Sequence, residues 1–224
     1  MADDAKTIDP ALRYSRQKDL VPAERLSTCR ITIIGVGAIG RQVALQLAAM
    51  GAPSLQLVDF DTVDESNLAS QGYLQDDLGR PKVVATGALC HQIHHQVEVI
   101  QANERFRRSM EIGNVLLCCV DSIATRRLIW EAVKAKVSVF VDTRMSAEVV
   151  RVLAAADEPS RQHYPTTLFA AEQAFAGSCT AKSTLYTANI AAGLAIGQFT
   201  RWLRGLPIDA DLSLNLLTSE LTVS

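Results

Sequence analysis

Residues 31–61 constrain the fold of this chain more than any other stretch. A short β-branched apolar run at 31–34 has the composition of a buried parallel strand. Gly35, Gly37 and Gly40 follow it with the spacing G-x-G-x-x-G. Such a turn needs one glycine for its backbone angles, a second so that a phosphate can approach the main chain, and a third so that the helix packs on the strand. The pattern predicts a strand, turn and helix that hold a phosphate at the helix N-terminus.

The residues after this turn complete a βαβ unit. A helix is expected at 38–50, with apolar residues on one face, and Gly51 ends it. A second apolar strand at 55–58 leads into Asp59, nineteen residues beyond Gly40. This placement suits a carboxylate that reaches a ribose hydroxyl. The context favours nucleotide binding over a merely structural glycine turn, but it does not choose between a dinucleotide and ATP.

Apolar runs alternate with helical patterns along the rest of the chain. Strands are expected at 97–101, 114–120 and 137–141, a strand or buried segment at 149–156 and a final strand at 212–223, with helices at 82–95, 125–136 and 180–204. This order predicts an α/β, Rossmann-like nucleotide-binding fold with a mostly parallel central sheet and helices on both faces. A single domain over 1–224 is the simplest interpretation, with an N-terminal helical arm at 1–26 and an irregular loop at 157–178.

Composition excludes several classes of partner and compartment. A net charge of −2 argues against nucleic-acid binding through bulk electrostatics. The chain has five cysteines, an odd number without a disulfide framework, which points to a reducing compartment. No segment approaches the roughly 18 apolar residues that span a membrane, and the N-terminus has no secretory pattern. The expected location is the cytoplasm.

Several charged side chains are candidates for a site. Lys82 follows Pro81 at the start of a helix, where the dipole disfavours a cation unless an anion is nearby. Asp121 follows an apolar strand, at the edge where open α/β sheets bind ligands. The segment at 13–17, Arg-Tyr-Ser-Arg-Gln, reads from its spacing as a solvated helix face. His91 and His95 lie four apart but lack partner ligands, so no metal site is expected there.

Together these segments resemble the ThiF/MoeB/HesA family of adenylating enzymes, which are related to the activating enzymes of ubiquitin-like proteins. The resemblance extends from about residue 13 to 206. It rests on Arg-Tyr-Ser-Arg-Gln at 13–17, Gly-Val-Gly-Ala-Ile-Gly at 35–40, Asp-Phe-Asp-Thr-Val with Ser-Asn-Leu within 59–68, Gly-Arg-Pro-Lys at 79–82 and Val-Asp at 120–121. It implies that the nucleotide is ATP.

The resemblance also implies a role for individual residues. An aspartate in the position of Asp59 binds the ribose, a lysine in that of Lys82 contacts phosphate, and Asp121 would help to hold Mg²⁺. The arginine in the position of Arg16 reaches across a homodimer into the neighbour's site, which overturns the interpretation of 13–17 as a solvated face. The residues expected to line the ATP site are Gly35, Gly37, Ala38, Gly40, Asp59, Asp61, Asn67 and Lys82.

The chemistry implied is attack of a carboxylate on the α-phosphate of MgATP, which gives an acyl-adenylate and pyrophosphate. Mg²⁺, Lys82 and Arg16 would neutralise charge, and no general base is needed because the carboxylate is ionised near pH 7. The implied substrate is the Gly-Gly-type C-terminus of a small ubiquitin-like or sulfur-carrier protein, threaded beneath a crossover loop at 157–178. A conjugating or sulfur-transfer protein would follow, and Arg16 and the Gly/Ala-rich helix favour a homodimer.

Two departures and one cysteine limit what the resemblance implies. No arginine follows Ser-Asn-Leu at 66–68, so either Arg80 or another cation compensates, or phosphate binding is altered. The paired C-x-x-C motifs that bind structural zinc are absent, so we predict no zinc. Cys179 aligns with a cysteine that takes the acyl group as a thioester in some relatives and has no shown covalent role in others. A helix N-terminus lowers a thiol pKa, which favours a nucleophile there.

Four functions remain open at this stage. The first is adenylation of a carrier protein, with or without a thioester on Cys179. The second is activation of a small carboxylate or of one on a modified tRNA base, against which the near-neutral charge argues mildly. A scaffold subunit of a heterodimeric activating enzyme is the third, and the retained glycines weigh against it. An NAD-linked oxidoreductase is the rival at the level of the fold alone.

Overall fold

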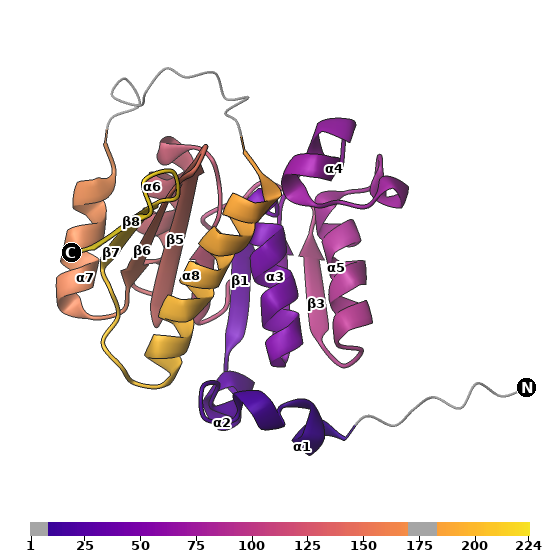
Figure 1. Ribbon diagram of the computed structural model, residues 1–224, viewed down its shortest axis with the longest axis horizontal. Helices are drawn as coiled ribbons and strands as arrows, with labels where there is room; N and C mark the ends of the chain where they lie inside the picture. Colours follow the sequence, from indigo (N-terminus) through magenta and orange to yellow (C-terminus); the bar gives the residue numbers. More distant parts are fainter. Residues whose placement is uncertain (1–8, 170–182) are drawn as a thin grey trace, which may run out of the picture.

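The structure is a computed structural model that describes residues 9–169 and 183–224 (Figure 1). In these residues one sheet has the strand order β3-β2-β1-β4-β5-β6-β7-β8. The strands are β1 Arg30–Ile34, β2 Ser54–Val58, β3 Glu98–Ala102, β4 Val115–Cys118, β5 Val139–Ser146, β6 Val149–Ala155, β7 Asp211–Asn215 and β8 Glu220–Val223. The first five are parallel, and β6, β7 and β8 are antiparallel to their neighbours. The predicted fold class, a mostly parallel sheet in a Rossmann-like order, is confirmed.

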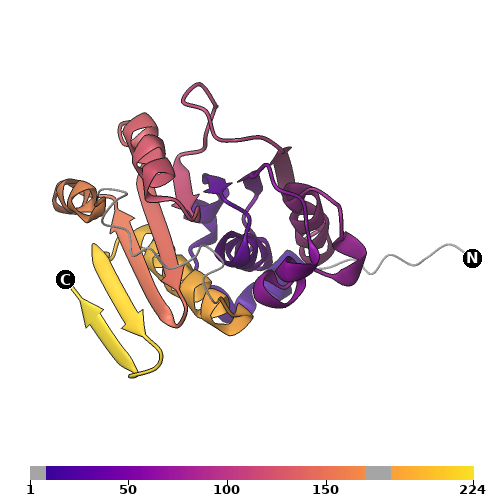
Figure 2. The same cartoon turned by 90° about the horizontal axis from the view of Figure 1, so that it is seen from above.

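Helices cover both faces of the sheet, as Figures 1 and 2 show. The helices are α1 Pro10–Arg13, α2 Ala23–Ser27, α3 Ala38–Met50, α4 Glu65–Gln71, α5 Lys82–Ile93, α6 Ile123–Val133, α7 Glu158–His163 and α8 Leu185–Leu203, with 3₁₀ turns η1 Ser15–Gln17, η2 Gln75–Asp77 and η3 Tyr164–Thr167. On one face α3, α5 and α8 pack side by side, and α6 and α7 pack on the other. No described helix is long and apolar enough to cross a membrane.

The core has two layers because successive side chains of a strand point to opposite faces. In β4, Leu117 packs in the layer under α3 and α8, whereas Leu116 packs in the layer under α6. In β5, Val141 and Phe140 divide in the same way, and all four side chains are fully buried. Apolar runs without alternation are therefore the signature of strands that are covered on both sides.

Most predicted elements occur, and several of the expectations need correction. The helix at 38–50 is confirmed, whereas the last helix begins at Leu185 and the expected final strand is a β7–β8 hairpin whose turn holds Ser219 at a φ of 56°. Helix α4 follows Asp59 in a stretch where no helix was predicted, and the stretch expected to be irregular from 157 begins with α7 and η3. Residues 170–178 of the predicted crossover loop lie outside the described residues.

Candidate functional site

The glycine turn follows β1 where the connections change direction. β1 lies between β2 and β4, so the turn is at the topological switch point of the sheet. Gly35 has a φ of +87°, and a Cβ there would stand 2.8 Å from the carbonyl carbon and oxygen of Cys119. A Cβ on Gly40 would collide with the carbonyl of Gly35. These two glycines are required by backbone packing alone, whether or not a ligand binds.

Gly37 differs, because open space lies beside it. A Cβ there would meet only the side chain of Gln71, whose Oε1 would be 3.7 Å away. Gly37 is also the N-cap of α3, and among the described residues this helix start has no side-chain cap. The Gln71 Oε1 atom is itself buried without a hydrogen-bond partner in the described residues. The free amides and the room beside Gly37 fit the binding of an anionic phosphate.

Asp59 is oriented toward this turn by main-chain amides. Its Oδ2 accepts a hydrogen bond of 2.6 Å from the amide of Val36, and its Oδ1 accepts one of 2.8 Å from the amide of Asp61. The residue is 9% exposed. A carboxylate has about four acceptor sites, so two remain for hydroxyl donors such as those of a ribose. The geometry leaves Asp59 free to accept hydrogen bonds from a hydroxyl-bearing ligand.

Lys82 and Asp61 form an ion pair at the start of α5. The Lys82 Nζ is 3.2 Å from Asp61 Oδ2, and the lysine side chain is 8% exposed against 48% for the aspartate. The Lys82 amide also donates to the Asp61 carbonyl at 2.9 Å. The structure therefore joins Asp59, Asp61 and Lys82 through consecutive hydrogen bonds beside the glycine turn. The aspartate offsets a cation that the helix dipole disfavours.

Asn67 occupies a capping box that the sequence analysis missed. Its Oδ1 accepts a hydrogen bond of 3.2 Å from the amide of Asp64, the N-cap of α4, and the Asn67 side chain is buried. The Ser66 hydroxyl and amide hold the pKa of the exposed Asp64 carboxyl below its usual range. An Asp followed three residues later by a polar side chain is the sequence signal for such a helix start. In this structure Asn67 shapes the loop above the site.

Asp121 is exposed and lies just beyond β4, before Ser122, the N-cap of α6. It follows Val120, whose amide would be 3.0 Å from a Cβ on Gly35, so it belongs to the same edge as the glycine turn. The described residues contain no group of three or more His, Cys, Asp or Glu that could hold a metal by itself. Mg²⁺ is commonly bound by one or two carboxylates together with substrate phosphates. Asp121 fits that kind of site.

Arg16 lies at the opposite edge of the sheet. Its neighbour Gln17 donates to the carbonyl of Met50 at 2.7 Å, at the C-terminal end of α3, and the ring of Tyr14 packs against Gly51. α3 has 13 residues, which at 1.5 Å per residue separate Arg16 from the glycine turn by roughly 20 Å. The exposed Arg16 does not join the site of its own chain. Cys179 lies outside the described residues.

A buried polar cluster beneath the turn was not predicted. Arg41, 1% exposed, donates from Nε and Nη2 to the carbonyl of Gly72 at 3.1 and 3.0 Å. Its guanidinium lies 4.3 Å from the ring centre of Tyr73, whose hydroxyl donates to the Val36 carbonyl at 2.5 Å. Burial lowers the pKa of Arg41 and raises that of Tyr73. The only sequence signal for this cluster was an arginine among the apolar residues of a helix. The periodicity of the sequence does not indicate which residue contacts that arginine.

Asp142 is the centre of a second buried cluster. The strand expected at 137–141 continues in β5 to Ser146, so the carboxylate of Asp142 is fully buried in mid-strand. It pairs with Arg126, and its Oδ2 accepts hydrogen bonds of 2.9 Å from Arg144 Nε and from the Tyr164 hydroxyl. Two arginines and a tyrosine hydroxyl thus surround this carboxylate. The cluster connects β5, α6 and η3 and is structural.

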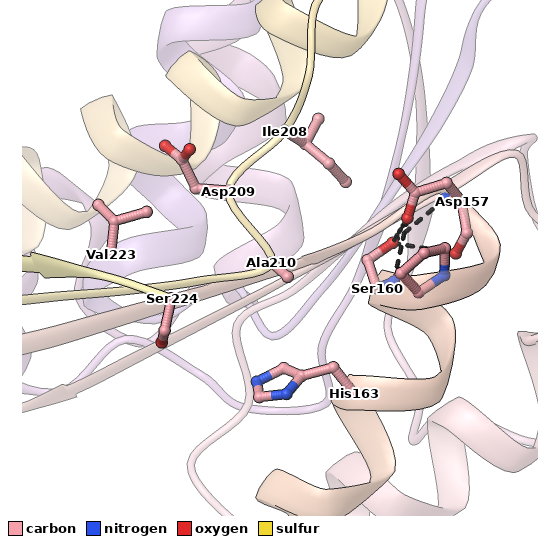
Figure 3. A pocket seen from close by; sticks show the side chains of 9 residues that line it. Asp157, Ser160, His163, Ile208, Asp209, Ala210, Val223 and Ser224 are labelled. Atoms are coloured by element: carbon pink, nitrogen blue, oxygen red, sulfur yellow. Dashed lines mark hydrogen bonds between the residues drawn. The ribbon is translucent and has the colours of Figure 1, made fainter.

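A cavity of about 440 Å³ lies at the other edge of the sheet, beyond the end of β6 (Figure 3). It holds a serine, a histidine and aspartates, a combination that resembles a hydrolase site. The Ser160 hydroxyl, however, donates to the Asp157 carbonyl at 3.0 Å and accepts from the Ala156 amide at 3.0 Å. His163 contacts Asp211 at 3.0 Å. The serine is therefore part of a helix cap and is not available as a nucleophile.

Comparison with known proteins identifies a family that matches most of this chain. The profile of the ThiF family matches residues 14–221. The chain is 34% identical over 137 residues to adenylyltransferase and sulfurtransferase MOCS3 of Sus scrofa, covering 55% of this chain and 30% of that protein. It is 34% identical over 126 residues to molybdopterin-synthase adenylyltransferase of Haemophilus influenzae, covering 51% and 52%. The chain thus spans about half or less of these relatives.

Two further likenesses are more distant. The NEDD8-activating enzyme E1 catalytic subunit of Caenorhabditis elegans is 30% identical over 114 residues, covering 47% of this chain and 26% of that protein. The crystal structure of PaaA superposes with a TM-score of 0.79 at 19% identity, covering 100% of this chain and 77% of that one. At this identity the structural likeness supports the fold only.

Proposed function

This chain belongs to the ThiF family, and from that membership we propose that it is an adenylyltransferase. Its substrates are ATP and the C-terminal carboxylate of a small ubiquitin-like or sulfur-carrier protein that ends in Gly-Gly. The products are an acyl-adenylate and pyrophosphate. The observation that carries the proposal is the continuous arrangement of an open Gly37, the amide-held Asp59 and the Lys82–Asp61 pair at one edge of the sheet.

The residues at this edge divide the binding of ATP among them. The free amides of the turn, with Ala38 as the first helical residue, receive phosphate oxygens, and Asp59 accepts from the ribose. Lys82 exchanges part of its contact with Asp61 for a phosphate oxygen. Asp121 would hold Mg²⁺, which would neutralise part of the charge of the phosphates. The incoming carboxylate then displaces pyrophosphate at the α-phosphate.

A homodimer would complete the site. Arg16 lies roughly 20 Å from the glycine turn of its own chain, as the length of α3 sets, so a catalytic role for it requires a second copy. α8, which contains Gly193 and Gly197 with open space beside both, is the surface we propose for close packing between copies. A thioester step on Cys179 and transfer to a conjugating or sulfur-transfer protein, in the reducing cytoplasm that the cysteine composition favours, are the finer parts of the proposal.

The test of the reaction is ATP–pyrophosphate exchange by the purified protein, with and without small proteins that end in Gly-Gly. We expect exchange that depends on the added C-terminus and falls by about 10²- to 10³-fold in Asp121→Ala and Lys82→Ala. His91→Ala, an exposed change on the same helix as Lys82, is the control. Exchange that survives in Cys179→Ala would place the cysteine after adenylation. Absence of both exchange and ATP binding would refute the proposal and favour a scaffold subunit.

Mixing two inactive variants tests the shared site. In a dimer of Arg16→Ala and Asp121→Ala chains, one of the two sites has every group intact. If subunits exchange freely, half of the dimers are mixed, so about a quarter of the wild-type exchange rate should return. Mixtures that stay inactive despite proven subunit exchange, or a fully active monomer in sedimentation, would exclude an arginine supplied by the partner.

A further inference from the structure

Arg41 is a buried cation without an anionic partner among the described residues. Its relative exposure is 1%, and the ion pairs of the structure do not include it. The buried carboxylates nearby have other partners: Asp77 pairs with Arg80 at 2.9 Å, and Asp59 accepts from main-chain amides. Burying an unpaired charge is energetically unfavourable even after relaxation of the surroundings. The presence of a positive charge at this buried position therefore needs an explanation.

The position of Arg41 supplies one. It follows Gly40 in the first turn of α3, and its guanidinium stacks on the ring of Tyr73 at 4.3 Å. The hydroxyl of that ring donates to the carbonyl of Val36, which lies between Gly35 and Gly37 in the turn. Thr86 links the two, 3.4 Å from Arg41 Nη1 and 3.2 Å from the Tyr73 hydroxyl. The charge lies directly behind the glycine turn, on its protein side.

We propose that Arg41 is a positioning residue whose positive charge, acting through the glycine turn, favours the phosphates of the bound nucleotide without touching them. The inference rests on the proposed function and deepens its ATP site. The same side chain holds the C-cap of α4 through the Gly72 carbonyl, so it couples the loop above the site to the charge below it.

A Coulomb estimate gives the size of the effect. At roughly 10 Å and an effective dielectric constant of about 20, one unit charge changes the binding of one phosphate charge by about tenfold. Salt screens this effect only weakly, because Arg41 is buried. A ligand without phosphate gains nothing from it. The ratio of ATP affinity to adenosine affinity therefore isolates the charge from any general damage to the site.

The experiment uses calorimetry to measure how adenosine, AMP and ATP bind to the wild type and to the variants Arg41→Lys, Arg41→Met and Arg41→Gln. Arg204→Met removes an exposed arginine at the far end of α8 and is the matched control. We expect Arg41→Met and Arg41→Gln to lose about tenfold or more in ATP affinity with adenosine affinity unchanged. Arg41→Lys should retain the preference for ATP to within about threefold, because its charge remains.

The outcomes separate the two proposals. A wild type that prefers ATP over adenosine, with the same preference in every Arg41 variant, would overturn the charge effect and leave the proposed function standing. Equal losses for ATP and adenosine would assign Arg41 to holding the α4 cap alone and would also overturn it. A wild type without any preference for ATP would overturn both. If Arg41→Met does not fold, Arg41→Gln against Arg41→Lys makes the same comparison.

Discussion

Replacing Asp142 by asparagine tests the buried cluster on β5. Asp142 is fully buried, and the Arg126 and Arg144 side chains that pair with it are only 5% and 13% exposed. An amide in place of the carboxylate offers one acceptor instead of two and turns an NH₂ group toward a guanidinium. The variant keeps the volume of the side chain, so cavity formation does not contribute. The result isolates the loss of the buried negative charge.

The structure sets the expected magnitude. Breaking a buried ion pair by removing one partner destabilises a protein by about 3–5 kcal/mol. For a domain of this size each kcal/mol lowers the melting temperature by about 2–4 °C, so the Tm should fall by roughly 6 °C or more. Urea unfolding followed by circular dichroism measures the free energy directly.

A surface pair provides the control for Asp142→Asn. Glu131 and Lys134 form an ion pair at 2.6 Å on α6, but their side chains are 46% and 48% exposed. Such pairs contribute about 0–1 kcal/mol, so Glu131→Gln should change the free energy of unfolding little. If Asp142→Asn loses no more stability than Glu131→Gln, the view of this cluster as a tightly coupled ionic centre is wrong.

Three further predictions concern the glycine turn, acid stability and the cysteines. Gly35→Ala should unfold the turn or destabilise the protein by several kcal/mol more than Gly79→Ala, because both have positive φ but only Gly35 is obstructed by the Cys119 carbonyl; equal melting temperatures would contradict this. Burial raises the pKa of Asp211, but hydrogen bonds from Arg151 and His163 outweigh it and hold that pKa below its usual value. Its stabilisation is therefore present above about pH 4 and is lost as pH falls through the folded value, so Asp211→Asn should flatten acid unfolding curves below pH 4. Burial raises the pKa of Cys90 to about 12, so iodoacetamide at pH 8 should leave Cys90 unmodified in the native protein and label it after unfolding, as peptide mapping would show.

The amino-acid sequence was enough to predict the fold class and to propose most residues of the candidate site. Continuous apolar runs identify strands that are covered on both faces, and the glycine spacing predicts a turn that the structure confirms through the crowding at Gly35 and Gly40. Asp59 could be placed because it comes directly after a strand, and strand ends share one edge of a parallel sheet. Each of these signals is formed by residues that are close together in the chain, so it can be recognised from the sequence alone.

Contacts between side chains that are far apart in the chain could be identified only from the tertiary structure. No periodicity indicates that Arg41 lies behind the turn against Tyr73, or that Asp142 is surrounded by two arginines and Tyr164. The distance of Arg16 from the glycine turn of its own chain also came from the fold, because Gln17 contacts the C-terminal end of α3 at Met50. The partners of a buried charged side chain can be identified only in three dimensions. The free energy of a charge depends on the groups that surround it in space, not on its neighbours in the chain.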